Sequence, residues 1–292
     1  MNIREQIQIK GRDVFLQNGN GILNIAQRLG KIRISIMILE ALNKKKNILI
    51  SYPDNRIQQS WIDDFRFWGF DYSGVVFTNN SSLFKYTEQK WEFFIMDEIH
   101  TLSDNQIEQA ALICKNSKNV LGLSGTISLD TEMQIRAILG LNILMKYSVE
   151  EAIKDGIIAD YKIFIHKVNL DNIIKTKNKK GKLVSEKQQY DAYSYVIEQI
   201  KYSGRDPGFL LLNRNRVLQN SISKHKKALS LLKELKGKRI LVFTGTKKAS
   251  ESLGIPFFHS SSKDPDIFDN FKAGKIDEIA LVDMGKSGVT FK

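Results

Sequence analysis

Two adjacent carboxylates follow a short apolar run in the first third of the chain. Asp97 and Glu98 come directly after Phe93–Met96, a run that predicts a buried strand. Ligands bind at the carboxyl edge of an open α/β sheet, so this strand would bring both acids to such an edge. One carboxylate can hold a magnesium ion while its neighbour polarises a water for attack on phosphorus. A solvated turn after a strand has the same pattern, so the pair alone leaves both interpretations open.

A glycine–lysine turn lies about 66 residues upstream of these acids. Gly21–Gln27 predicts a strand, Arg28–Lys31 a tight turn and Ile32–Leu42 a helix. In this arrangement backbone N–H groups and the helix dipole face an anion, and Lys31 can reach outer phosphates. The phosphate-loop pattern G-x-x-x-x-G-K-[ST] is incomplete, because isoleucine replaces the first glycine and Ile32 replaces the hydroxyl residue that ligates magnesium. The alternative is a helix start with a surface lysine.

A third candidate is the turn Ser124-Gly125-Thr126, which follows the predicted strand Val120–Leu123. Small hydroxyl side chains in a glycine turn can form a hydrogen-bonded relay beside a phosphate site. The same residues can also form an ordinary turn at a strand end.

Strand and helix patterns alternate around these three turns. Asn47–Tyr52 and Val75–Thr78 predict strands, and Asp54–Gly69 and Asp104–Lys115 predict helices, which together indicate βαβ units and a parallel sheet. We place Trp61 and Trp68 in the core, because they share an apolar stripe. A new strand is expected at Tyr161–Val168. The sequence thus predicts two α/β domains, 1–147 and 148–292, with a Lys-rich loop at 171–184 that is either solvated or in contact with phosphates.

Composition narrows the class of partner. The chain has 292 residues and a formal net charge of +12, which favours a polyanion, with nucleic acid ahead of an anionic membrane surface. A single cysteine, Cys114, excludes an intramolecular disulfide and a cysteine-based zinc cluster, and it reads as a small buried hydrophobe. No apolar run is long enough to span a membrane, and a cytosolic location is the expectation. We expect a cluster of basic residues at a strand–helix junction, where they either contact phosphates of a nucleic acid or form a solvated helix face. The cluster consists of Arg214, Arg216, Lys224, Lys226 and Lys227.

The order of the three turns resembles that of superfamily-two helicases and translocases of the DEAD/DEAH class. A Gly-Lys turn, a strand ending in Asp97–His100 and a strand ending in Ser124–Thr126 follow one another within one α/β domain. In the second half, Val242–Thr246 resembles the family's motif IV and Gly285–Phe291 resembles its motif V. The resemblance covers nearly the whole chain and is closest to phage-encoded and restriction-type members. It implies two RecA-like domains that face each other across a nucleotide cleft, the second of them incomplete.

The resemblance also implies a role for each matching residue. ATP and Mg²⁺ are the expected cofactors, with Asp97 as metal ligand, and Asp97, Glu98 and Lys31 as catalytic residues. ATP binding is assigned to Gln27, Arg28, Gly30, Lys31 and Gly288. Coupling of hydrolysis to strand binding is assigned to His100, Ser124 and Thr126. Nucleic-acid binding is assigned to Ser51, Tyr52, Pro53, Thr78, Asn79, Thr244, Gly245, Thr246 and Thr290.

Two departures from the family pattern leave two functions open. Ile32 removes a direct magnesium ligand, and the sequence ends at Lys292, before the family's arginine-bearing motif, which suggests a truncated form or a reduced second domain. The first hypothesis is an ATP-dependent helicase or translocase, acting on DNA rather than RNA. The alternative is a nucleic-acid-binding or structural module that keeps the helicase fold with impaired ATP turnover.

Overall fold

The computed structural model describes residues 2–177, 181–259, 262, 264 and 266–282. The chain divides into two compact units, Met1–Lys162 and Ile163–Lys292. This division falls after the boundary expected near residue 147, because the segment that follows the last strand of the first sheet packs with the first unit. The expected site residues Gly288 and Thr290 lie outside the described residues.

The first unit is built on a six-stranded parallel sheet with the order β3-β2-β4-β5-β1-β6. The three strands that precede the candidate turns, β4, β5 and β1, are therefore direct neighbours. Because they run parallel, their carboxyl ends meet at one edge of the sheet. The strands are β1 (Asn20–Ile25), β2 (Lys46–Tyr52), β3 (Gly74–Asn79), β4 (Trp91–Met96), β5 (Ser117–Ser124) and β6 (Ile143–Tyr147).

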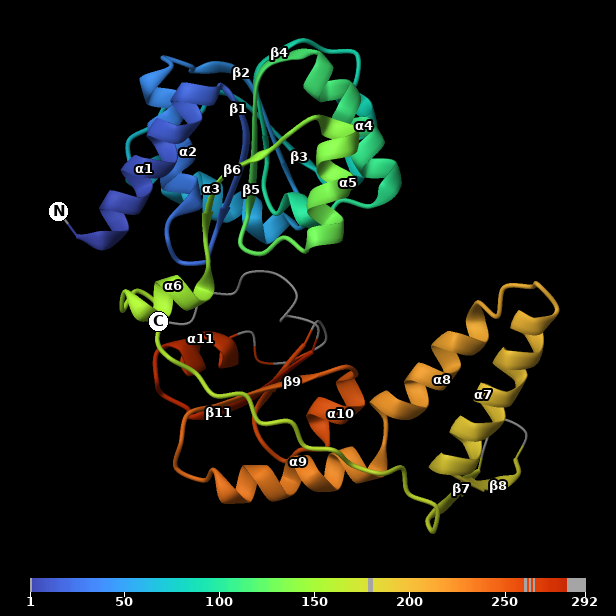
Figure 1. Ribbon diagram of the computed structural model, residues 1–292. Helices are drawn as coiled ribbons and strands as arrows, with labels where there is room; N and C mark the ends of the chain where they lie inside the picture. Colours follow the sequence, from blue (N-terminus) through green and yellow to red (C-terminus); the bar gives the residue numbers. More distant parts are fainter. Residues whose placement is uncertain (1, 178–180, 260–261, 263, 265, 283–292) are drawn as a thin grey trace. The chain divides into compact units, whose positions relative to one another are not determined.

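Helices cover both faces of this sheet (Figure 1). On one face lie α1 (Ile3–Asn18), α2 (Lys31–Ala41) and α3 (Asn55–Phe67), and on the other lie α4 (Asp104–Lys115) and α5 (Leu129–Leu139). Alternate side chains of each strand enter different cores: in β4, for example, Phe93 packs with the α1–α3 face and Phe94 with the α4–α5 face. Burial on both sides explains why the strands read as continuous apolar runs. Two short 3₁₀ helices (Asn80–Tyr86 and Ile99–Thr101) and α6 (Val149–Lys154) complete the unit.

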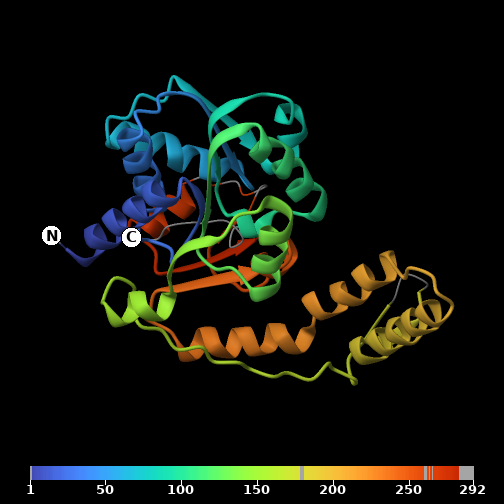
Figure 2. The same ribbon diagram turned by 45° about the horizontal axis from the view of Figure 1, so that its top comes forward.

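The second unit contains a smaller parallel sheet with the order β10-β11-β9. A separate helical arm, α7 and α8, extends away from this sheet, and its two helices lie side by side in both views (Figures 1 and 2). The fold class is confirmed, because both units are α/β with parallel sheets. The elements are β7 (Lys175–Lys177), β8 (Leu183–Ser185), α7 (Glu186–Tyr202), α8 (Phe209–Gln219), α9 (Ile222–Glu234), β9 (Ile240–Thr244), α10 (Lys247–Glu251), β10 (Phe257–Phe258), α11 (Ile267–Lys272) and β11 (Glu278–Val282).

Three local expectations are wrong. The segment expected as a strand at Tyr161–Val168 has no regular structure and exposes its apolar side chains, because a strand also needs an edge to pair with. Trp68, expected in the core, ends α3 and is 42% exposed, whereas Trp61 is fully buried. Arg214 and Arg216 lie inside α8 rather than at a strand–helix junction. The Lys-rich loop contains a short antiparallel hairpin, β7–β8. Among the described helices, none has the length and apolar character that a bilayer span requires.

Candidate active site

The loop between β1 and α2 is shaped for close approach of an anion. Gly30 has a left-handed backbone with φ of 79°, and a side chain at this position would meet Gln8 Nε2 at 2.6 Å. Gln8 also fixes the loop by donating its side-chain N–H to the carbonyl oxygen of Leu29 at 2.8 Å. No side chain caps the first turn of α2, so its N–H groups are available to a ligand.

The lysine of this loop contacts the strand end that carries the acids. Lys31 Nζ lies 3.2 Å from Glu98 Oε1, although the two residues are far apart in sequence. The third turn reaches the same place, because a Cβ built on Gly125 would lie 3.4 Å from Lys31 Nζ and 3.3 Å from Gln27 Cγ. A cavity of about 270 Å³ lies beside these groups and is lined in part by Gln27, Arg28, Gly125 and Thr126. The three candidate turns therefore meet at Lys31, and residues of the first and third turns line the cavity beside it.

Asp97 is buried at the base of this site. Its Oδ2 accepts a hydrogen bond from Trp61 Nε1 at 2.8 Å, and its Oδ1 accepts one from the backbone N–H of Glu98 at 2.9 Å. Its own N–H donates to the carbonyl oxygen of Ser51 at 2.8 Å, which ties the end of β4 to β2. Burial raises the pKa of Asp97 to about 6, and the charge of Lys31 and the two hydrogen bonds only partly oppose this rise.

His100 joins the acidic strand end to the third turn. Its Nδ1 lies 2.8 Å from Ser124 Oγ and 3.4 Å from Glu98 Oε2. Ser124 Oγ in turn donates to the carbonyl oxygen of Thr126 at 3.0 Å. Burial lowers the pKa of His100, and the charge of Glu98 only partly opposes this. A continuous polar chain thus runs from Glu98 through His100 to the turn after β5.

The residues assigned to nucleic-acid binding in the first unit lie farther along the same edge. Ser51, Tyr52 and Pro53 follow β2, and Asn79 ends β3 and donates through Nδ2 to the carbonyl oxygen of Pro53 at 3.1 Å. The Thr78 hydroxyl donates to the carbonyl oxygen of Asn79 at 3.3 Å. Because β2 and β3 lie on the opposite side of β4 from β1, these residues lie away from Lys31.

The corresponding residues of the second unit form the turn between β9 and α10. Thr244 Oγ1 donates to the carbonyl oxygen of Thr246 at 3.2 Å, and Thr246 caps α10. Gly245 lies between them and is exposed.

The donor set fits a magnesium–nucleotide complex that is bound mainly through phosphates and one carboxylate. Mg²⁺ in such sites takes one or two protein carboxylates and keeps several waters. Asp97 fits this role, because its raised pKa marks a buried carboxylate with too little positive charge around it. The position after Lys31 carries no hydroxyl that could ligate magnesium, because Ile32 stands there and packs against the core. The hydroxyl of Ser35, one helical turn on, donates to the carbonyl oxygen of Lys31 at 3.1 Å. Among the described residues, and this site is included, no group of three or more acidic, His or Cys side chains is arranged to hold a metal ion by itself.

Sequence reasoning missed two residues of this site, Gln8 and Trp61. Trp61 was expected only as a core residue, yet its indole N–H contacts the key carboxylate. A buried Trp normally needs a hydrogen-bond acceptor, and that rule is the signal that could have drawn attention to it. Gln8 gives no comparable sequence signal, because a glutamine on a helix is ordinarily solvated.

Comparison with solved structures identifies the fold. The helicase domain of Hef from Pyrococcus furiosus aligns with a TM-score of 0.54 at 14% identity, over 98% of this chain and 86% of that one. A Sulfolobus solfataricus SWI2/SNF2 ATPase core in complex with dsDNA aligns with a TM-score of 0.40 at 14% identity, over 94% and 77%. The UvsW helicase of bacteriophage T4 aligns with a TM-score of 0.42 at 18% identity, over 48% and 58%.

At the level of sequence, no protein-family model and no curated protein matches the chain. The match to the Hef helicase domain nevertheless shows that the chain has the fold of that helicase domain. This confirms the family resemblance at the level of the fold.

Proposed function

We propose that this chain is an ATP-dependent nucleic-acid translocase or helicase that acts on DNA. The observation that supports this most directly is the meeting of Lys31 and Glu98, at 3.2 Å, beside Gly125 and the uncapped start of α2. A lysine, a carboxylate and free backbone N–H groups at the carboxyl edge of a parallel sheet are what phosphoryl transfer to water requires.

Each group has a distinct part in this reaction. Lys31 and the first-turn N–H groups of α2 bind the outer phosphates. Magnesium, when bound at Asp97, neutralises phosphate charge. Glu98 orients the attacking water and accepts its proton as the new oxygen–phosphorus bond forms and the bond to the leaving diphosphate breaks.

The polar chain from Glu98 to Thr126 supplies a route for coupling. His100 contacts both Glu98 and Ser124, so a shift of Glu98 on phosphate binding also changes the hydrogen bonding of the turn after β5. Nucleic acid bound along Ser51–Pro53 and Thr78–Asn79 would lie on the same edge of the sheet. We therefore propose that His100, Ser124 and Thr126 couple ATP hydrolysis to the binding of nucleic acid.

A second candidate function is a nucleic-acid-binding module with impaired ATP turnover. Ile32 favours it, because this side chain packs into the core where a metal-ligating hydroxyl is otherwise used. Ser35 does not replace the hydroxyl, since its Oγ is bonded to the carbonyl oxygen of Lys31.

ATP hydrolysis in the presence and absence of single-stranded DNA tests both candidates. We expect DNA-stimulated hydrolysis by the unaltered chain, a loss of about 100-fold or more in Lys31→Met, and no loss in the exposed control Lys10→Met. Ile32→Thr is expected to raise hydrolysis by about 10- to 100-fold if the missing hydroxyl limits the rate.

Three results would contradict the enzymatic proposal in different ways. If neither the unaltered chain nor Ile32→Thr hydrolyses ATP while both bind DNA, the second candidate is correct. If Lys31→Met hydrolyses ATP as fast as the control, the site has been placed wrongly. If the chain binds neither ATP nor DNA, both candidates fail.

A further inference from the structure

The positive charge of the chain is concentrated in one segment. Residues 171–238 contain sixteen Lys and Arg and six Asp and Glu, a net charge of +10 out of +12 for the whole chain. The remaining residues, with 28 basic and 26 acidic side chains, account for only +2. In the second unit this segment forms the β7–β8 hairpin, the α7–α8 arm and α9. Such a local excess is the electrostatic signature of a surface that binds a polyanion.

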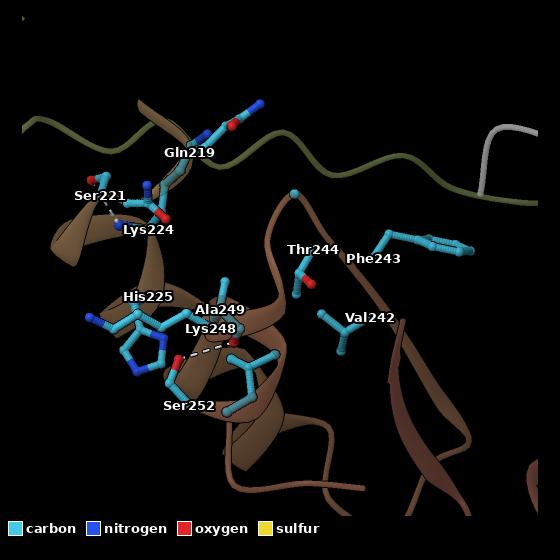
Figure 3. A pocket seen from close by; sticks show the side chains of 14 residues that line it. Gln219, Ser221, Lys224, His225, Val242, Phe243, Thr244, Lys248, Ala249 and Ser252 are labelled. Carbon is cyan, nitrogen blue, oxygen red and sulfur yellow. Dashed lines mark hydrogen bonds between the residues drawn. The ribbon is translucent and has the colours of Figure 1, made fainter. Parts of the chain in front are cut away.

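Two adjoining cavities lie along this segment. The larger, of about 540 Å³, lies among α9, the end of β9 and α10 (Figure 3). The smaller, of about 380 Å³, lies among α7, α8 and the hairpin. Asn220 and Lys248 line both cavities, so the two form one groove that runs from the arm to the turn at Gly245. We call this the arm groove, and its members used below are Tyr193, Arg216, Asn220, Lys224, Gly245 and Lys248.

The arm groove carries cations that no protein carboxylate neutralises. Arg216, Lys224 and Lys248 are exposed, and within the described residues none of them is within ion-pair distance of an acid. Of the acidic residues that the structure describes, Glu186 alone lines either cavity. Its carboxylate already accepts hydrogen bonds from the Ser221 hydroxyl at 3.0 Å, from the Ile222 N–H at 2.8 Å and from the Asp171 N–H. The groove therefore presents three positive charges to an anion from outside.

The neutral groups of the groove suit a nucleotide chain. Tyr193 is half-buried in the smaller cavity and offers an aromatic ring for base stacking. Asn220 offers amide donors and acceptors, and the glycine at 245 allows a backbone to approach the turn closely. Cavities of about 380 and 540 Å³ have the size of small-ligand sites and hold one or two nucleotides each. A rigid double helix is too wide to enter them.

We propose that the arm groove binds a single-stranded segment of nucleic acid. Phosphates contact Arg216, Lys224 and Lys248, and a base stacks on Tyr193. The inference rests on the proposed function only in taking nucleic acid as the partner. It adds a binding site that runs from the helical arm to the turn between β9 and α10.

The test is binding of a fluorescein-labelled oligothymidylate of 12 nucleotides to the full chain, measured by fluorescence anisotropy without ATP. We expect the triple variant Arg216→Gln, Lys224→Gln and Lys248→Gln to bind at least 10-fold more weakly than the unaltered chain. A matched triple removes the same charge outside the groove: Lys201→Gln, Arg205→Gln and Lys233→Gln. It should lose less than 3-fold. In the groove triple alone, the slope of log K against log salt concentration should become shallower by about 2, because three phosphate contacts at about 0.7 each are lost.

Stacking is tested separately by Tyr193→Leu. This variant should bind about 5-fold or more weakly, whereas Tyr202→Leu, at an 87% exposed position on the same helix, should be unchanged. Thermal melting followed by circular dichroism shows whether each variant is folded.

Several outcomes would overturn the proposal. Equal losses in the two triples would mean that net charge, not the groove, attracts DNA. Equal competition by a blunt duplex would exclude a single-strand site. Binding of anionic vesicles with the same dependence on the groove triple would assign the surface to a membrane, and failure of the unaltered chain to bind the oligonucleotide would also refute the inference. The assay contains no nucleotide, so its result is independent of whether the chain hydrolyses ATP.

Discussion

At the scale of single residues, the Lys31–Glu98 ion pair would, in the proposed mechanism, connect phosphate binding to activation of the base. The two side chains are only 11% and 20% exposed, so solvent screens the attraction between their charges less than it would at an open surface. The phosphates of a bound nucleotide would compete with Glu98 for the same ammonium. Glu98 would then have an oxygen free for water, and it would acquire this freedom only when phosphate is present.

Asp97 carries a stability cost that depends on pH. Its pKa is about 6 in the folded chain against an ordinary value of 3.8, so between these values the folded state binds more protons than the unfolded state. The free energy of unfolding should therefore fall as pH rises from 4 to 6, by about 3 kcal/mol, and remain lowered at neutral pH. Asp97→Asn removes this titration, so its free energy of unfolding should not fall over this pH range; the cost of turning its amide NH2 toward Trp61 Nε1 or the Glu98 N–H is the same at every pH.

Urea unfolding from pH 4 to pH 7.5, with EDTA present, measures this effect. The exposed control Asp130→Asn should follow the pH profile of the unaltered chain. Parallel profiles for Asp97→Asn and the unaltered chain would contradict the explanation by burial.

At the scale of elements, the order of the strands brings the residues of the candidate active site together. β4, β5 and β1 lie next to one another in the sheet although β2 and β3 separate β1 from β4 in the chain, and parallel pairing brings their carboxyl ends together. The second residue after β4 adds a local requirement, because Glu98 has a left-handed backbone with φ of 50°. This turn directs the chain into the short helix that carries His100 and so places two polar side chains beside one pocket.

Glu186 holds the elements of the second unit together at the base of the arm. Its carboxylate accepts hydrogen bonds from Ser221 and Ile222 at the start of α9 and from the N–H of Asp171, which precedes the β7–β8 hairpin. The Glu186 side chain thus joins α7, α9 and the segment before the hairpin. Glu186→Gln removes the charge and one acceptor, and it should lower the free energy of unfolding of this unit by about 1–3 kcal/mol. Urea unfolding measures this, with the exposed Glu198→Gln on the same helix as control. A loss no greater than that of the control would show that these hydrogen bonds contribute little.

At the scale of the whole molecule, the chain consists of two units with separate cores. The cores of the first unit flank its large sheet, and that of the second unit is a small cluster around Phe268, Phe271, Ile279 and Leu281. Residues 159–170 connect the units without regular structure, and Ile163, Phe164 and Ile165 in this segment are strongly exposed. The connection is therefore the expected site of first cleavage by a protease.

Limited digestion with trypsin tests this organisation. The first cuts should follow Lys162 or Lys167 and release a stable N-terminal fragment that ends there, because backbone outside regular structure enters a protease site easily. Mass spectrometry of the early fragments identifies the cuts. If the first cuts fell within the six-stranded sheet, the first unit would not be the stable fragment that we expect.

Much of the fold and of the candidate site could be predicted from the sequence, because the decisive signals are local. Apolar runs such as Phe93–Met96 have the length of buried strands, and the predicted helix at Asp104–Lys115 matches α4. The Gly-Lys turn and the acidic strand end are each a few consecutive residues. The resemblance to a helicase core rested on their order, and the structural match supports it at the level of the fold.

The sequence by itself thus determined the alternation of strands and helices, the class of fold, the residues at the strand ends and the excess of positive charge. Tertiary structure alone decided that Trp61 donates to Asp97, that Gln8 supports the loop at Leu29, and that two cavities join into the arm groove. These contacts unite residues that are distant along the chain, and no local pattern encodes which distant partner a side chain meets. Periodicity is set by neighbours in sequence, whereas hydrogen-bond partners and hollows are set by how the finished elements pack.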